Sequence, residues 1–251
     1  MKRVIFTILV VSIAGISSAV HGDLMIRREV TAHQVPIPGM SREKAEPCSN
    51  PIKYASTGDI VTLYAAEDRL RREQGDLVII LRRDSKTLYL VYPLRQEYNE
   101  IKFPLRTKKS TDMIDSDWKK YELQDSEGPE IVSIGEWIGK KYSATLVNKL
   151  RFDYRVSYVL SDAHFEHSAI FLTLRKAIHQ LRFGRYGWIG LLPQLEGLPL
   201  VWEEEFLLRS GQVRYREEAV AIEEVEPMAG RYEVDPLFQK VDFNPACFEL
   251  R

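Results

Sequence analysis

The sequence predicts a mainly β fold of the α+β class, with one large, curved antiparallel sheet and a single substantial helix. Short apolar segments recur at regular spacing between residues 61 and 103, and a second set of segments follows. Only one stretch, 164–182, has a clear helical period. In a chain of 251 residues, we expect a signal peptide at 1–22 followed by a single domain at 23–251.

The N-terminal segment has the residue order of a secretory signal peptide. Two basic residues, 2–3, precede the apolar run 4–16, and the small residues 17–19 follow it. The run is short for a membrane span, which needs about 20 residues. We therefore expect cleavage after Ala19 or Gly22 rather than an uncleaved anchor. Because no later segment of the sequence is long and apolar enough to cross a membrane, this predicts a soluble, periplasmic protein.

The charge balance and the cysteines narrow the classes of partner. The chain has 35 basic and 36 acidic side chains, and the basic ones are spread out. Proteins that bind nucleic acid usually show a basic patch, so we expect no nucleic-acid partner. Cys48 and Cys247 both lie in the exported part. In an oxidising compartment they would pair and tie the N-terminal loop to the C-terminal tail, and two separately buried thiols are the alternative.

An irregular lead-in rich in proline, 34–58, precedes a meander of short strands. Turn residues separate these strands, and such regular spacing is typical of an antiparallel sheet. The predicted strands are 61–66, 69–73, 77–83, 87–92 and 97–103. A charged stretch, 106–130, separates the meander from the second set of elements.

The hairpin 77–92 is apolar on both of its faces. One face carries Leu77, Ile79, Leu81, Leu88, Leu90 and Tyr92, and the other carries Val78, Ile80, Tyr89 and Val91. One face would pack on the helix 164–182. The other must meet a second layer, a partner chain or a ligand, because a large bare apolar face is rare on a soluble monomer. A sandwich or closed barrel whose core uses both faces in different places is the alternative.

The second set begins with a half-buried strand and continues into the helix. The apolar face of the strand consists of Phe152, Tyr154, Val156, Tyr158 and Leu160. The helix has one apolar stripe, formed by Phe171, Leu174, Ile178 and Leu181. A glycine-rich loop, 183–197, follows with Trp188 and other apolar residues. This loop would be core filler, a lid, or a contact with a membrane surface.

The last unit is a long hairpin that we expect to turn at Ser210 and Gly211. That register places Glu204 opposite Glu217, on the same apolar face as Trp202. Like charges directly opposite are unfavourable in a sheet, and a buried carboxylate pair would share a proton. A bulge that shifts the register, or a pair at a wet rim, are the alternatives.

No motif of the sequence predicts catalysis. His164 and His167 would share a helix face and suit two positions of a metal site, but no spacing supplies a third ligand. They are more simply polar residues in the first turn of a helix. The sequence has no nucleophile elbow, phosphate loop or CxxC. We therefore expect no catalytic residue, no metal and no cofactor.

The order of segments resembles a family of uncharacterised exported bacterial proteins that is similar in architecture to the periplasmic lipoprotein carriers, the LolA/LolB-like superfamily. The stretches that carry the resemblance are "DLMIRREVTAHQV", "DRLRREQGDLVIILRRDSKTLYLVYPLRQEYNEIKFP", "GLPLVWEEE" and "VAIEEVEPMAGRYEVDPLFQKVDF". They look like an exported first strand, a tight meander, a late hairpin and an ordered tail. The sequence departs from the carriers in having one long helix where they have several helical pieces.

The resemblance implies a half-open β-barrel with the helix over its concave side, which holds acyl chains in the carriers. We therefore expect a carrier or sensor of a lipid or acyl chain that is not an enzyme. An envelope module that binds a protein is the alternative, and a hydrolase has the least support. The residues expected to line a hydrophobic site are Ile79, Leu81, Leu90, Tyr92, Phe152, Tyr154, Trp188 and Trp202.

Overall fold

The computed structural model describes residues 22–33, 57–103, 122–147, 153–183, 192, 196–208 and 211–243. The strands in chain order are β1 (Asp23–His33), β2 (Ile60–Ala65), β3 (Arg69–Gln74), β4 (Leu77–Arg82), β5 (Thr87–Tyr92), β6 (Glu97–Lys102), β7 (Glu122–Ile134), β8 (Trp137–Val147), β9 (Asp153–Ser161), β10 (Leu198–Leu208), β11 (Gly211–Val225) and β12 (Gln239–Lys240). The helical elements are the 3₁₀ turns η1 (Pro93–Arg95) and η2 (Phe165–His167) and the α-helix α2 (Ser168–Phe183).

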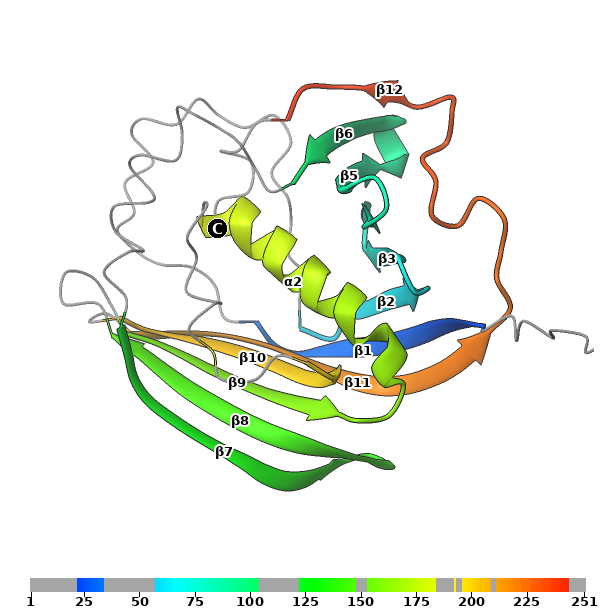
Figure 1. Cartoon of the computed structure of the whole chain (residues 1–251). Helices are drawn as coiled ribbons and strands as arrows, with labels where there is room; N and C mark the ends of the chain where they lie inside the picture. Colours follow the sequence, from blue (N-terminus) through cyan, green and yellow to red (C-terminus); the bar gives the residue numbers. More distant parts are fainter. Residues whose placement is uncertain are drawn as a thin grey trace, which may run out of the picture.

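The twelve strands form one sheet in the order β12-β6-β5-β4-β3-β2-β1-β11-β10-β9-β8-β7. All neighbours are antiparallel except β12 and β6. The sheet is strongly curved and unclosed, and α2 crosses its concave side (Figure 1). The predicted mainly β fold with a curved antiparallel sheet and one main helix is confirmed.

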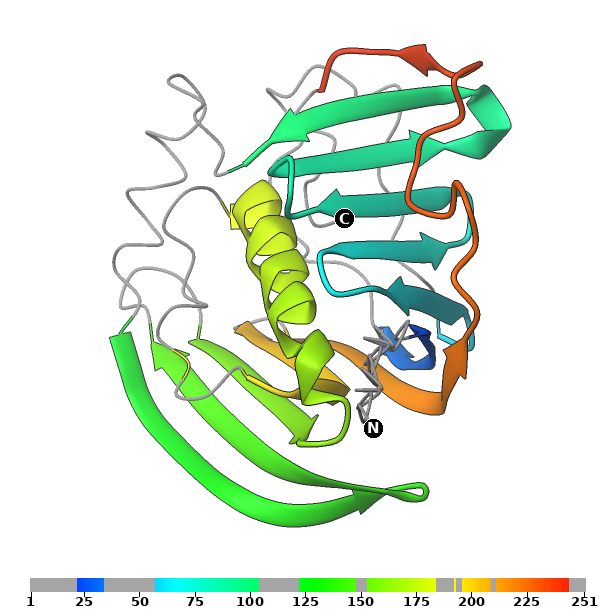
Figure 2. The same ribbon diagram turned by 45° about the vertical axis from the view of Figure 1, so that its right-hand side comes forward.

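The first strand lies in the middle of the sheet. β1 pairs with β2 on one side and with β11 on the other. It therefore joins the meander β2–β6, which forms one wall, to the strands β7–β11, which form the other (Figure 2). This arrangement brings residues near the start of the described chain beside residues near its end.

The meander matches the sequence-based prediction, since β2 to β6 begin and end within one residue of the predicted strands. Pairing of Ile79 with Leu90 and of Leu81 with Leu88 confirms the predicted division of faces in the β4–β5 hairpin. These four side chains are buried on the concave side, in one core with Phe171 and other residues of α2.

The convex face of the same hairpin is covered by the C-terminal part of the chain. Val78, Ile80 and Val91 are buried against Tyr232, and Val234 and Phe238 pack on the same cluster. This segment, 226–243, runs along the outer side of the meander (Figure 2). The sequence left open whether a second layer, a partner chain or a ligand covers this face. A second layer is observed, and the chain's own C-terminal segment forms it.

Backbone and side-chain contacts fix this tail. The amide of Gln239 donates to the carbonyl of Gln96 at 2.7 Å, and the amide of Val241 donates to the carbonyl of Tyr98 at 2.9 Å. At the other end of the segment, Nη1 of Arg231 lies 2.5 Å from Oδ2 of Asp23. The tail thus adds β12 to the edge of the meander and forms an ion pair with the first residue of β1.

Two elements differ from the sequence-based prediction. The helix begins at Ser168 rather than at 164, because His164 has a left-handed backbone with φ of 51° and the 3₁₀ turn η2 follows it. The charged stretch 106–130 is not simply a separator, since it contains the first part of β7. β7 is an edge strand whose side chains are mostly exposed, so it lacks the apolar alternation that predicts a strand.

The predicted register of the last hairpin is wrong. Leu208 pairs with Gly211, whereas a Ser210–Gly211 turn would place Leu208 opposite Val213, so the pairing is shifted by two residues. As a result Glu204 lies opposite Tyr215, and Glu217 lies opposite Trp202. The two carboxylates share a face of the sheet but are not a directly opposed pair.

In the part of the chain that the structure describes, no helix has the length and apolar character needed to cross a membrane. Cys48 and Cys247, like the predicted signal segment, lie outside the described residues.

Candidate functional site

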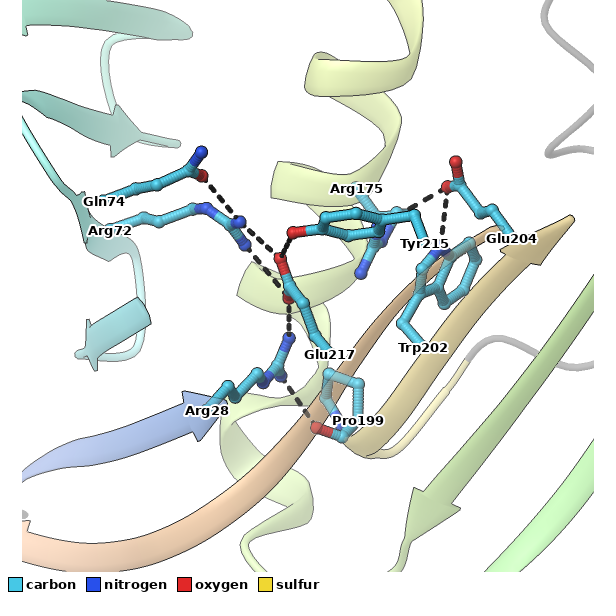
Figure 3. Close-up of polar contacts among 9 residues, drawn as sticks. All are labelled: Arg28, Arg72, Gln74, Arg175, Pro199, Trp202, Glu204, Tyr215 and Glu217. Atoms are coloured by element: carbon cyan, nitrogen blue, oxygen red, sulfur yellow. Dashed lines mark hydrogen bonds and ion pairs between the residues drawn. The ribbon is translucent and has the colours of Figure 1, made fainter. Parts of the chain in front are cut away.

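Four charged side chains occupy inward-facing positions on the concave side of the sheet. In β1, Arg28 follows Leu24 and Ile26 on the buried face, and in β3 Arg72 follows Leu70. In the last hairpin Glu204 and Glu217 are both only 2% exposed. Because β1, β3, β10 and β11 are near neighbours in the curved sheet, these side chains converge beneath α2 (Figure 3).

Glu217 is the centre of this charged cluster. Its Oε2 accepts hydrogen bonds from Nη1 of Arg28 at 3.3 Å and from Nη1 of Arg72 at 3.2 Å. Its Oε1 accepts from Nη2 of Arg72 and from the hydroxyl of Tyr215. Both oxygens of this carboxylate are therefore fully engaged by the protein's own donors (Figure 3).

These contacts keep Glu217 charged although it is buried. Burial by itself would raise the pKa of this carboxyl, but the charge and hydrogen bonds of Arg72, with the charges of Arg28 and Arg175, hold the pKa well below its usual range. Burial and the neighbouring Glu217 carboxylate raise the pKa of Tyr215. Tyr215 is therefore a neutral hydrogen-bond donor, and Glu217 is a structural anion rather than a proton-sharing acid.

The second carboxylate, Glu204, is bound by an indole and faces the third arginine. Nε1 of Trp202 donates to Oε1 of Glu204 at 2.7 Å. Nη1 of Arg175, from α2, lies 4.0 Å from that same oxygen. The Arg175 guanidinium also lies over the Trp202 ring, 3.8 Å from its centroid, and Trp202 stacks on Tyr158. Arg175 thus reaches from the helix to β10, and Trp202 connects it to β9.

The cluster has more cation than anion. Arg28, Arg72 and Arg175 carry three positive charges against the two negative charges of Glu204 and Glu217, so one positive charge is uncompensated among the described residues of the cluster. Burial lowers the pKa of Arg28 to about 10, against the opposing effect of Glu217, and burial also lowers the pKa of Arg175. Both pKa values are lowered because the neighbouring residues do not fully replace the hydration that these guanidinium groups lose on burial.

The donors of the arginines are also incompletely used. Arg28 donates through Nη1 to Glu217 and through Nη2 to the carbonyl of Pro199 at 2.7 Å. Arg72 uses both terminal nitrogens, with Oε1 of Gln74 at 2.9 Å as a further acceptor. The Nε groups of Arg28 and Arg72 are buried and have no hydrogen-bond partner in the structure.

A small pocket lies beside the cluster, between α2 and the sheet. Its volume is about 30 Å³, which is room for roughly one water molecule. Both charged and apolar side chains line it. Its lining includes Arg28, Arg72, Arg175, Trp202, Leu63 and Phe171.

Only one of the residues that the sequence predicts for a hydrophobic site lines this pocket, namely Trp202. Ile79, Leu81 and Leu90 are buried in the concave core, in the wall formed by β4 and β5. Tyr92 is half-buried in the same wall and donates its hydroxyl to Oδ1 of Asn99 at 3.2 Å. Tyr154 is fully buried in β9. Phe152 and Trp188 lie outside the described residues.

The arginines of the site were missed by sequence reasoning, although a signal for two of them was present. Arg28 stands in the alternation Leu24, Ile26, Arg28, Val30, where an apolar residue would be expected. Arg72 follows Leu70 at the same spacing. A charge in an inward position requires a buried partner of opposite sign, and Glu204 and Glu217 had already been placed on an apolar face.

The histidines do not form a site. His164 precedes η2 and His167 ends it, so they are not on one face of a regular helix. Within the described residues, no group of three or more His, Cys, Asp and Glu side chains is arranged to hold a metal ion.

No protein-family model matches this chain, and no curated protein matches it either.

Proposed function

We propose that the protein is an exported, non-enzymatic binding protein that carries or senses a lipid or an acyl chain in the periplasm, with the ligand on the concave side of a half-open barrel. The observation that carries the proposal is a concave apolar wall that, among the described elements, is covered by the single helix α2. The wall is formed by β4 and β5 with their neighbours, and α2 packs on it through a stripe that includes Ile170, Phe171 and Leu174. An acyl chain would replace this stripe with equivalent apolar contacts.

The pocket between α2 and the sheet is too small for an acyl chain, so binding requires a change in the structure. Pockets that enclose a drug-sized ligand have about 300–1,000 Å³, about ten times or more the 30 Å³ found between α2 and the sheet. The ligand therefore enters only if α2 moves away from the wall. The apolar stripe of α2 then separates from the wall, and the concave face becomes the binding surface.

The proposal is tested by uptake of a fluorescent fatty acid into the wild type and into variants of the wall. Leu90 is fully buried in the concave core, so Leu90→Arg places a charge where the acyl chain would lie and is expected to abolish uptake. Leu90→Ala is expected to retain uptake at reduced affinity. Leu94→Arg is the matched control, because Leu94 is 84% exposed; it should bind like the wild type.

A second candidate function is a module of the cell envelope that binds a protein, and the filled concave side favours it. If the side chains of α2 are the permanent filling of the sheet, no hydrophobic ligand is taken up by any of these proteins. Absence of uptake by the wild type would therefore reject the carrier and leave the module.

Export is tested separately. Expression of the full chain in a Gram-negative host, followed by N-terminal sequencing of the periplasmic protein, should give a terminus near Val20 or Asp23. Recovery of the intact Met1 terminus in the membrane fraction would reject both export in soluble form and the periplasmic role.

A further inference from the structure

The guanidinium of Arg175 is the least satisfied charge on the concave side. Its nearest carboxylate oxygen, Oε1 of Glu204, is 4.0 Å away, beyond the length of a hydrogen bond. Among the described residues it makes no hydrogen bond, and its other contact is with the face of Trp202. It nevertheless is only 19% exposed. A guanidinium carries five N–H donors in a planar fork, so Arg175 offers several donors for which the described residues supply no acceptor within hydrogen-bond distance.

The neighbouring carboxylates do not meet this demand. Both oxygens of Glu217 are engaged by Arg28, Arg72 and Tyr215. The Glu204 oxygen nearest to Arg175 already accepts the indole N–H of Trp202. The buried Nε groups of Arg28 and Arg72 add two more donors without acceptors. Buried donors and charges of this kind destabilise a protein unless an acceptor reaches them.

The pocket that the three arginines share is otherwise apolar. Leu63, Phe171, Leu174 and Ile178 form part of its walls. Arginines together with apolar side chains match a molecule that has an anionic head and a hydrocarbon chain. A free inorganic anion would use only the arginines.

We infer that this pocket binds the oxyanion head group of an anionic amphiphile, a carboxylate or a phosphate, with Arg175 as the main donor and Arg28 and Arg72 beside it. The inference rests on the proposed function and adds the class of ligand to it. A carboxylate or phosphate accepts two parallel N–H bonds from one guanidinium, which is a strong and geometrically selective contact. It also supplies the negative charge that the cluster lacks.

The test compares laurate with its uncharged methyl ester, each displacing the neutral fluorescent probe phenylnaphthylamine from the full-length protein. The wild type is expected to bind laurate at least about tenfold more tightly than methyl laurate. Arg175→Met keeps the apolar stem and should remove this preference while leaving the affinity for methyl laurate unchanged. Lys176→Met, the same change of charge at an exposed neighbour on α2, should retain the preference, and Arg175→Lys should restore part of it.

Each other outcome overturns the inference in a distinguishable way. Equal affinity of the wild type for laurate and methyl laurate rejects the head-group site but leaves a carrier of neutral lipid. Displacement by neither compound rejects the proposed function as well. If inorganic phosphate stabilises the wild type against thermal unfolding but not Arg175→Met, and laurate does not bind, the arginines bind a small anion instead. The affinities of the wild type for laurate and for methyl laurate decide whether the site selects an anionic head group, even if Arg175→Met does not fold.

Discussion

At the scale of single residues, the centre of the molecule is a carboxylate that stays ionised in the core. Glu217 is 2% exposed, and it is surrounded by arginines that are 189 and 145 residues away in the sequence. A buried ion pair contributes little net stability compared with an apolar replacement, but removing one partner leaves the others uncompensated. Glu217 therefore holds β1, β3 and β11 in one arrangement.

Replacing this residue tests that role. Glu217→Gln leaves Arg28 and Arg72 buried without their main counter-charge, and it is expected to lower the free energy of unfolding by about 3–5 kcal/mol. Glu218→Gln is the matched control, since Glu218 is on the opposite face and pairs with Arg216 near the surface at 2.7 Å. That change should cost less than about 1 kcal/mol. Urea unfolding measures both, and equal effects would contradict a special role for Glu217.

The same carboxylate sets a dependence on pH. Burial opposes its ionisation, but the arginines outweigh burial, so folding lowers the pKa of Glu217 from its ordinary value of 4.5. The stability that it contributes is therefore complete above that ordinary value and is lost as the pH falls below it, towards the pKa of the folded state. Urea titrations between about pH 6 and about pH 3 should show a steeper loss of stability in the wild type than in Glu217→Gln. Parallel curves would mean that Glu217 is not the titrating group.

Sequence reasoning identified two of the five charged residues of this cluster, Glu204 and Glu217. The alternation of β10 and β11 placed Glu204 and Glu217 on the apolar face with Trp202, and that placement is correct. The predicted register was wrong. Ser210 and Gly211 favour a two-residue turn, but Gly211 belongs to β11 and pairs with Leu208. The alternation places Arg28 and Arg72 at inward positions, but local patterns do not reveal that they meet Glu217, because they do not show that β1 lies between β2 and β11.

At the scale of elements, the C-terminal segment 226–243 acts as a second layer for the meander. Tyr232 is 7% exposed and packs on Val78, Ile80 and Val91. Tyr232→Ala removes a large buried ring, and we expect it to lower the free energy of unfolding by about 2–5 kcal/mol. Leu237→Ala, in the same segment but 86% exposed, should change it by less than about 0.5 kcal/mol. Similar losses in the two variants would show that the segment does not stabilise the sheet through its apolar contacts.

The elements differ in how well local sequence predicts them. β2 to β6 alternate or are apolar throughout, and turn residues bound them, so their limits follow directly from the sequence. β7 is paired on one side only and is exposed along most of its length. Its place depends on pairing with β8 rather than on any apolar face, so the charged stretch 106–130 gave no sign of it.

The helix α2 is the element on which the proposed function depends. If a ligand replaces α2 on the concave wall, amides of Ser168–Phe183 should exchange with deuterium faster when laurate is bound, while those of β4 and β5 should keep their protection. Mass spectrometry of peptides after exchange measures both sets. Binding of laurate with unchanged exchange in α2 would place the ligand elsewhere.

At the scale of the whole molecule, one curved sheet carries two different coverings. The chain's own tail closes the convex side of the meander, and the concave side has α2 above a cluster with surplus positive charge (Figures 1 and 3). This division answers why the β4–β5 hairpin is apolar on both faces. A ligand of the proposed carrier would lie on the concave side, because residues of the same chain occupy the convex side of the meander.

The most direct test of this account is native mass spectrometry of the full-length protein purified gently from the periplasm of an expressing bacterium, with extraction and identification of any bound lipid. We expect a population of the wild type whose mass exceeds that of the chain by one anionic amphiphile. This population should be absent from Leu90→Arg. A bare chain mass that laurate does not change on titration would contradict the account.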